Sequence, residues 1–381
     1  MRSIAWALLA CWPLRAAPAQ GAPSAPTWKL SGYYLNLLTA STTVIPVGDR
    51  YVLDLSRLRL KLEGTPLTAV RLQVQYDNEV FLGSYLRTRQ FAATKDREPD
   101  ASLDLDWVYA DGRSGFGRHR LYRATVTWSG HSLDLTVGRQ RIAWGTGRFW
   151  SPLDILNPFD PARLEREERP GVDAVLLDRR IGPLGKLDLV FAPATTRSRA
   201  AGAGYVHGNV AGADYSALVG TFRGDLVVGG DFSGHIGGLG IRGEVTATRP
   251  DSGGRFTQAL FGADYGFANT LAVTGELYFN GQATSQRSGY DFAALFEGRI
   301  RNVARHYGAL AASYEITPLL KVLTYGIVNV DDGSRLLWPG LEYSVASNLD
   351  VAGGIQHFSG TAGSEYARFR TVFHLQVRGF F

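Results

Sequence analysis

The chain has 381 residues but a single cysteine, Cys11, and a single methionine, Met1. Beyond residue 20 it has no run of about 18 apolar residues, the length that a membrane-spanning helix needs. Scarce cysteine excludes a disulfide scaffold and cysteine-based metal sites. The missing apolar run excludes a helical membrane protein. Stability must therefore come from sheet pairing, hydrogen bonding and burial.

Charge and histidine placement exclude further classes. The 40 Lys and Arg residues nearly balance 35 Asp and Glu residues, and they are spread along the chain instead of clustering as nucleic-acid binding requires. The seven histidines lie singly, without metal-ligand spacing. The motif GLGIRG at 238–243 runs into an alternating strand and opens no helix, so a dinucleotide site is not expected. We predict no enzyme, no cofactor and no metal.

The N-terminus has the layout of a secretory signal peptide. Arg2 precedes an apolar run from Ile4 to Leu14, and small residues follow up to Ala19. This layout predicts a signal peptide over 1–19, cleaved after Ala19. The mature part, 20–381, is then exported and contains no cysteine.

The remaining sequence alternates between apolar and polar residues. AVRLQVQYD at 69–77 and GLGIRGEVTAT at 238–248 place apolar residues on one face and charged or amide residues on the other. About 18 segments of roughly ten residues follow this pattern, the length of a tilted membrane-spanning strand. Mean hydropathy near zero fits a wall with one lipid face and one water face. The prediction is an all-β transmembrane antiparallel barrel of 16 or 18 strands, in the outer membrane of a Gram-negative-type bacterium.

The connections support a barrel but leave its middle unresolved. Short turns, such as GTP after Glu63 and SG after Trp128, contrast with long loops at about 78–101, 142–171, 193–212 and 281–303. The two kinds alternate properly from the C-terminus back to about residue 256. In the middle they conflict, with one predicted strand starting near Leu103. The conflict indicates a miscounted strand within 78–120 and another within 193–236.

The C-terminal stretch RFRTVFHLQVRGFF, 368–381, predicts the closing strand. Its apolar residues fall on one face and its charged residues on the other. We expect it to pair with the first strand near Trp28. The stretch resembles the C-terminal signature of bacterial outer-membrane proteins that the assembly machinery recognises, ending in Phe381. It departs from that signature at Gly379.

One long segment breaks the alternation. Loop 142–171 is rich in Gly, Pro and Asp and carries three bulky aromatics, Trp144, Trp150 and Phe159. Its prolines stiffen the chain. Three bulky aromatic side chains would be unfavourable in water, so we expect them to be buried. We favour a constriction loop folded into the pore over a cap on the rim. GRQRIAWGTGRF, NPFDP and RPG within 137–175 resemble alginate-export-type and related uncharacterised porin-like families. The resemblance implies a pore-proximal role for Arg139, Gln140, Trp144, Gly145 and Asp160, although Thr146 stands where many relatives carry an acid.

These features together predict a passive channel for small polar or anionic solutes. Lipid is the expected partner of the outer face, and association of copies is left open. The alternatives are a scaffold or sheath for a periplasmic electron-transfer or export partner and, less favoured, an outer-membrane hydrolase. The residues of the predicted constriction are Arg139, Arg141, Arg148, Asp154 and Asp160. A basic seam is also predicted where the last strand meets the first ones, and it consists of Arg59, Arg71, Arg368 and Arg370, with Arg57, Lys61 and Arg378 beside them.

Overall fold

The computed structural model describes residues 26–95, 102–157, 162–164, 169, 171–194, 200–296 and 300–381. Within these residues the chain is nearly all β. Its strands are β1 (Thr27–Val44), β2 (Val47–Leu67), β3 (Val70–Leu82), β4 (Asp106–Asp111), β5 (Gly115–Ser129), β6 (Leu133–Gln140), β7 (Val172–Ile181), β8 (Gly185–Ala192), β9 (Ala201–Val210), β10 (Ala213–Phe222), β11 (Asp225–Ile236), β12 (Leu239–Arg249), β13 (Phe256–Gly266), β14 (Ala272–Asn280), β15 (His306–Thr317), β16 (Leu320–Asn329), β17 (Arg335–Ala346), β18 (Leu349–Ser359) and β19 (Val372–Phe380). The short helices are η1 (Ser84–Arg87), α1 (Arg89–Thr94), η3 (Arg287–Gly289), α2 (Phe292–Phe296) and η4 (Tyr366–Arg368).

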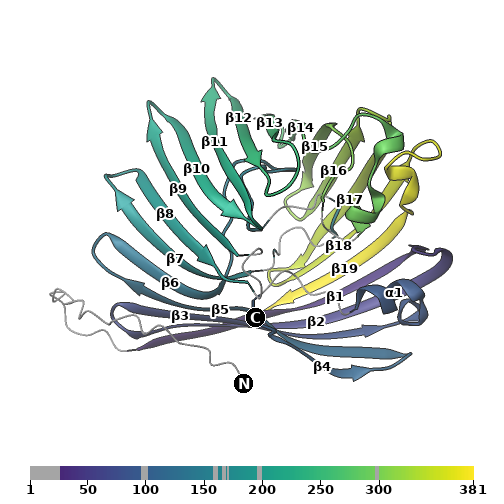
Figure 1. Cartoon of the computed structure of the whole chain (residues 1–381). Helices are drawn as coiled ribbons and strands as arrows, with labels where there is room; N and C mark the ends of the chain where they lie inside the picture. Colours follow the sequence, from purple (N-terminus) through teal and green to yellow (C-terminus); the bar gives the residue numbers. More distant parts are fainter. Residues whose placement is uncertain are drawn as a thin grey trace, which may run out of the picture.

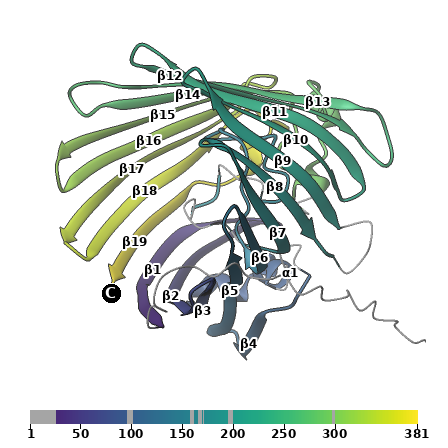
Figure 2. The same cartoon turned by 90° about the vertical axis from the view of Figure 1, so that its left-hand side faces the viewer.

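The strands close into an antiparallel barrel. Each strand of the ring pairs with its neighbours, and β19 returns to pair with β1, from Tyr33 opposite Phe380 to Ala40 opposite Phe373. Figures 1 and 2 show β19, which carries the C-terminus, beside β1. Backbone bonds between Gly32 and Phe381 extend the seam, at 2.9 and 3.1 Å. The closing role predicted for the terminal strand is confirmed.

Eighteen strands form the ring, because β4 lies outside it. β4 pairs only with β5, beside the end of β5 that is not covered by β6. The strand predicted near Leu103 therefore corresponds to β4 and does not cross the wall. Conversely, the predicted loop 193–212 contains a full wall strand, β9, which pairs with β8 and β10. One strand was gained and one lost, in the two regions where the connections conflicted.

The reason for both errors is physical. β9 has the sequence AGAGYVHGNV, whose small residues have low strand propensity, and only pairing on both edges makes it a strand. The turn predicted after Glu63 is also misplaced, because β2 continues to Leu67 through a register shift and turns at 68–69.

The two barrel ends differ in their connections. All connections at the end that holds the C-terminus are short, from 68–69 to 347–348, and we call this the turn end. The opposite end, the loop end, carries the long connections 83–105, 141–171, 281–305 and 360–371. This asymmetry is the one that the sequence predicted.

Alternation gives the wall two faces. In β2, Leu58 and Leu62 are exposed on the outside, whereas Arg57 and Arg59 are buried on the lumen side. Large apolar side chains remain exposed on the outer face all around the barrel, among them Leu277, Leu310, Leu341 and Phe373. The two largest buried clusters lie inside the barrel, where the long loop after β6 meets the wall. Within the described residues, no helix is both long enough and apolar enough to cross a membrane.

Candidate functional site

We call the loop that follows β6 the inner loop (141–171), and its described stretch 141–157 packs inside the barrel. Two stretches of it, 142–144 and 153–156, cover the inner face of β7 to β11. The buried loop residues of this cluster are Ile142, Trp144, Leu153, Ile155 and Leu156. They contact inward side chains of the wall, namely Ala174, Val190, Ala192, Ala201, Tyr205, Leu218 and Val227. Trp144 stacks on Tyr205 with ring centroids 5.2 Å apart.

The stretch between these two reaches the opposite half of the wall. Phe149 and Trp150 are buried against inward side chains of β13 to β17. Trp150 stacks on Tyr278, with centroids 5.3 Å apart and 12° between the rings. Phe149 meets Tyr325 edge to face at 5.7 Å. The described stretch 141–157 of the loop thus lies inside the barrel, against both halves of the wall.

Two carboxylates in the middle of the wall strands hold the loop backbone. Glu244 of β12 accepts bonds from the amides of Thr146, Gly147 and Leu153, at 2.5, 2.6 and 3.2 Å. The hydroxyl of Ser151 donates to the same carboxylate at 2.9 Å. These bonds satisfy donors that a buried loop would otherwise leave unpaired.

Glu276 of β14 holds the adjoining loop residues. Its carboxylate accepts from the amides of Arg148 and Phe149, at 2.6 and 2.8 Å, and from Arg242 Nε at 3.2 Å. The tight turn between the two anchors requires Gly147, since a Cβ there would lie 1.7 Å from the carbonyl oxygen of Trp150. Alternation placed both glutamates on the water-filled face, but nothing in the sequence marked them as loop anchors.

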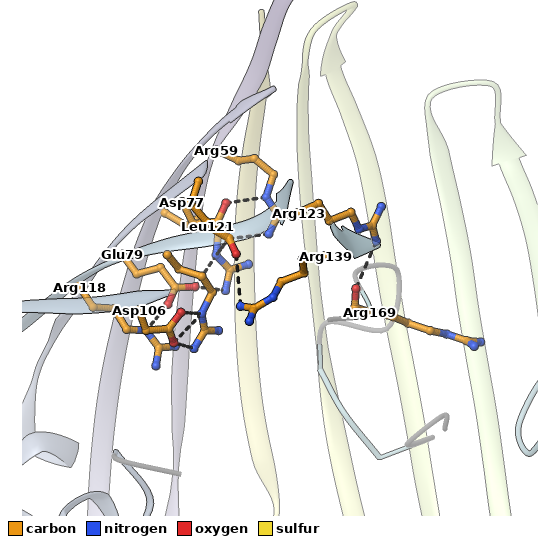
Figure 3. Close-up of polar contacts among 11 residues, drawn as sticks. Arg59, Asp77, Glu79, Asp106, Arg118, Leu121, Arg123, Arg139 and Arg169 are labelled. Atoms are coloured by element: carbon orange, nitrogen blue, oxygen red, sulfur yellow. Dashed lines mark hydrogen bonds and ion pairs between the residues drawn. The ribbon is translucent and has the colours of Figure 1, made fainter. Parts of the chain in front are cut away.

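We call the arginines on the inward face of β2 and β5 the arginine wall, namely Arg57, Arg59, Arg118 and Arg120, and their acidic partners Asp77 and Glu79 come from β3. Figure 3 shows Arg59 and Arg118 beside these two acids. Arg59 donates to Asp77 from Nε and Nη2, at 2.6 and 2.5 Å, and neither side chain is exposed. Glu79 accepts from Arg57 at 2.6 Å and from Arg118 at 2.6 Å. The wall is therefore built from ion pairs rather than from arginines alone.

The wall continues onto β4 and is packed by aromatic rings. Arg120 forms an ion pair with Asp106 of β4. The guanidinium of Arg59 lies 3.8 Å from the ring centre of Tyr122, which occupies a register shift in β5. A bulge of this kind redirects a side chain, and here it brings Tyr122 beside Arg59.

The predicted constriction residues occupy three different environments. Arg141 and Arg148 are exposed on the inner loop. Asp154 is buried and accepts from Arg169 Nη1 at 2.6 Å. Burial raises the pKa of Asp154 to about 8, while Arg169 and Arg141 act in the opposite direction. Asp160 lies outside the described residues.

Arg139 does not lie on the lumen face, where its predicted role would put it. Its side chain pairs with Asp173 at 2.9 Å. Asp173 lies on β7, where Ala174 and Leu176 pack inside the barrel, so alternation places Asp173 on the outer side. Arg139 lies opposite Asp173 on β6 and therefore faces the same side. Leu103 covers the pair there, with its amide donating to Asp173 and its carbonyl accepting from Arg139. The pair links β6 and β7 to the segment before β4.

The basic seam exists only in part. Arg59, Lys61 and Arg378 gather around the ring of Tyr33, at 5.5, 5.4 and 5.5 Å from its centre. Arg71 lies further along β3, near the turn end, and is exposed.

Arg368 and Arg370 are not part of the seam. They precede β19, in the loop 360–371 at the loop end, where Arg368 stacks on Phe292 at 3.8 Å and Arg370 donates to the carbonyl of Ala367. The expected seam placed them on the last strand, but that strand begins only at Val372.

Two cavities lie on opposite sides of the inner loop. The turn-end cavity has a volume of about 510 Å³ and is lined by inward residues of β14 to β19, including Tyr325, Trp338 and Arg378. The loop-end cavity has a volume of about 240 Å³ and lies between the inner loop and β10 to β14. In the described part of the chain, no three His, Cys, Asp or Glu side chains form a group that could hold a metal.

No protein-family model matches the chain, and no curated protein matches its sequence. Several solved structures share its fold. OccAB1 of Acinetobacter baumannii superposes with a TM-score of 0.58 at 9% identity, covering 93% of this chain and 96% of that one. The outer-membrane protein OpdK of Pseudomonas aeruginosa, also solved with vanillate, gives 0.56 at 11%, covering 93% and 98%. OpdH of the same organism gives 0.53 at 10%, covering 94% and 97%. The chain therefore has a porin-like β-barrel fold. The likeness to alginate-export-type proteins stays a prediction from residues 137–175.

Proposed function

We propose that this protein is a porin-like channel of the bacterial outer membrane, which passes small polar or anionic solutes by diffusion. The observation that carries the proposal is the inner loop. Glu244 and Glu276 hold it across the lumen at mid-strand, with a cavity on each side. A loop held in this way narrows a passage without needing an energy source or a catalytic centre.

The outer surface supports a membrane location. Apolar side chains such as Leu310 and Leu341 are more than half exposed, and they recur on the outward face of successive strands. Water would oppose so large an exposed apolar surface, whereas lipid accommodates it. The fold shared with the outer-membrane protein OpdK supports the same location.

The charges of the lumen favour a weak preference for anions. Arginines of the arginine wall are paired with Asp77, Glu79 and Asp106, which limits their attraction for a passing anion. Arg141 and Arg148 instead expose their charges on the inner loop. These two residues set the sign of the selectivity in our proposal, because a narrow passage concentrates the field of nearby charges.

The two ends of the chain support export and membrane assembly. We include in the proposal that residues 1–19 are removed as a signal peptide. We also include recognition of the last strand by the outer-membrane assembly machinery. Phe373, Leu375 and Phe381 present apolar side chains on its outer face.

Single-channel recording in a planar bilayer tests the proposal. The refolded protein should give discrete current steps, and a salt gradient should give a reversal potential with anion-selective sign. Arg141→Ala combined with Arg148→Ala should shift that potential toward zero. A folded, heat-modifiable barrel without current would contradict a channel and would favour a scaffold for a periplasmic partner.

A further inference from the structure

The loop-end cavity carries a binding surface of its own. Its aromatic side is the stacked pair of Trp150 and Tyr278. The other uncharged polar groups of its lining are Ser151 of the inner loop and, from β12 to β14 and the following loop, Thr248, Gln258, Asn280, Gln282 and Asn302. Side-chain amides offer both donors and acceptors. A small ring that carries several hydroxyl groups is the kind of solute that such a lining matches.

One buried donor in this lining lacks a partner. Trp150 is 4% exposed, and its indole Nε1 has no hydrogen-bond acceptor in the described part of the chain. A buried N–H without an acceptor costs free energy. Gln258 donates to Tyr278 Oη at 2.8 Å and to Asn280 Oδ1 at 3.2 Å, so the neighbouring groups are already ordered. A hydroxyl oxygen in the cavity would satisfy the indole.

Charge and size restrict the ligand further. The charged residues that line the cavity are two acids and two arginines, Asp154, Asp225, Arg223 and Arg301. Asp154 pairs with Arg169. The lining holds more uncharged polar side chains than charged ones, which favours recognition by hydrogen bonds over recognition by charge. The volume of about 240 Å³ lies below the roughly 300–1,000 Å³ of sites for drug-sized ligands.

We propose that the loop-end cavity binds a neutral polyhydroxylated solute of monosaccharide size, ahead of the passage beside the inner loop. This inference rests on the proposed channel function and names a solute class for it. The stacked rings contact the apolar side of the solute, and the amides and the Trp150 indole bond its hydroxyls.

Current block by D-glucose tests the inference. Glucose added at the loop end should reduce single-channel current in a saturable manner. Trp150→Phe keeps the ring but removes the N–H, and Asn280→Ala removes an amide. Each should raise the half-blocking concentration roughly five-fold, the effect of one lost hydrogen bond. Asn209→Ala, which removes an exposed amide at the turn end, should leave it unchanged.

The outcomes separate the two proposals. If the channel conducts but glucose does not block it, the sugar site is overturned and the channel function stands. The same holds if glucose blocks the unaltered protein and all variants equally. If the barrel does not conduct, calorimetric titration with glucose still decides the site. Binding that Trp150→Phe weakens roughly five-fold supports it, and no heat with the unaltered protein overturns it.

Discussion

Among single side chains, the buried ion pairs of the arginine wall differ most from ordinary surface pairs in how strongly stability depends on them. Arg59 and Asp77 are both fully buried, and Tyr33 and Tyr122 pack against the guanidinium. Removing two charges from water is costly, and the pair is stable only because its geometry is good. Loss of one partner leaves the other charge buried, so such pairs make the wall intolerant of single substitutions.

Asp77→Asn should therefore lower the free energy of unfolding by about 3 kcal/mol, because Arg59 would stay buried opposite a neutral amide. Urea unfolding of the refolded barrel in lipid measures this. Asp111→Asn provides the control, since Asp111 is half exposed in its pair with Lys95, and it should cost less than about 1 kcal/mol. Equal effects of the two substitutions would show that burial does not govern these pairs.

Among the structural elements, the inner loop stands apart because apolar contacts and carboxylate anchors hold it together. Apolar side chains of the loop are buried against both halves of the wall, and the glutamates hold the turn at 146–149. Without the glutamates, the buried amides of this turn would lack acceptors. The loop position in the lumen thus depends on residues from β12 and β14, far from it in sequence.

Glu244→Ala should loosen the turn of the inner loop, because it removes one acceptor shared by Thr146, Gly147, Ser151 and Leu153. We expect larger fluctuations of the open-channel current. Glu63→Ala removes an exposed carboxylate that bonds only to Gln73 among the described side chains, and it should leave the current noise as it is. Unchanged noise in the Glu244 variant would contradict the anchoring role.

At the loop end, the buried carboxyl of Glu365 links several elements. Glu365 accepts from Tyr307 Oη of β15 at 2.7 Å and from Asn329 Nδ2 of β16 at 2.9 Å. Its own amide donates to Asp332 at 2.8 Å. Burial, reinforced by the nearby Asp332 carboxylate, raises the pKa of Glu365 from 4.5 to about 7. The loops 330–334 and 360–371 are therefore joined through a group that titrates near neutrality.

A raised pKa means that the folded protein binds the proton more tightly than the unfolded chain. The stabilisation from Glu365 should be complete below about pH 4.5 and lost as the pH rises to about 7. We would measure the unfolding temperatures of the unaltered protein and of Glu365→Gln between pH 4 and 8. As the pH rises, that of the unaltered protein should fall relative to that of the variant. Parallel pH curves would show that Glu365 does not titrate in this range.

Across the barrel as a whole, the two faces of the wall determine which substitutions are tolerated. Leu375 is 48% exposed on the outer face of β19, and the adjacent Gln376 points toward the turn-end cavity. Adjacent residues of a strand therefore face lipid and water in turn.

Leu375→Arg should destabilise the barrel in lipid by up to about 2–4 kcal/mol, because it places a charge in hydrocarbon. Gln376→Arg, on the lumen side of the same strand, should cost far less. Unfolding of both variants in liposomes gives the comparison. A larger loss from the Gln376 variant would reverse the assigned faces.

Alternation explains how much of this architecture was predictable. The alternating strands and the terminal strand gave the barrel, its closure and its two unlike ends, because side-chain period is a local property. β9 escaped prediction because its Gly and Ala residues carry no alternation, and only its neighbours make it a strand.

The lumen was less predictable than the wall. The aromatics Trp144 and Trp150 indicated that the loop folds inward. Its anchors, Glu244 and Glu276, depend on contacts between residues about 100 and 130 positions apart, which alternation does not contain. Arg139 was expected near the pore from the resemblance of residues 137–175 to porin-like families, whereas Asp173 and Leu103 bury it on the outer side.

The most direct test of the channel and its inner loop is thiol modification during single-channel recording. In a Cys11→Ala background, which removes the only cysteine, Arg148→Cys places one thiol on the loop. A charged methanethiosulfonate reagent should then reduce the current of an open channel in a single step, whereas Asn269→Cys in a turn-end connection should give no step. Mass spectrometry confirms that each thiol has reacted. A fully modified Arg148→Cys protein with undiminished current would place the loop outside the conducting path and contradict the central claim.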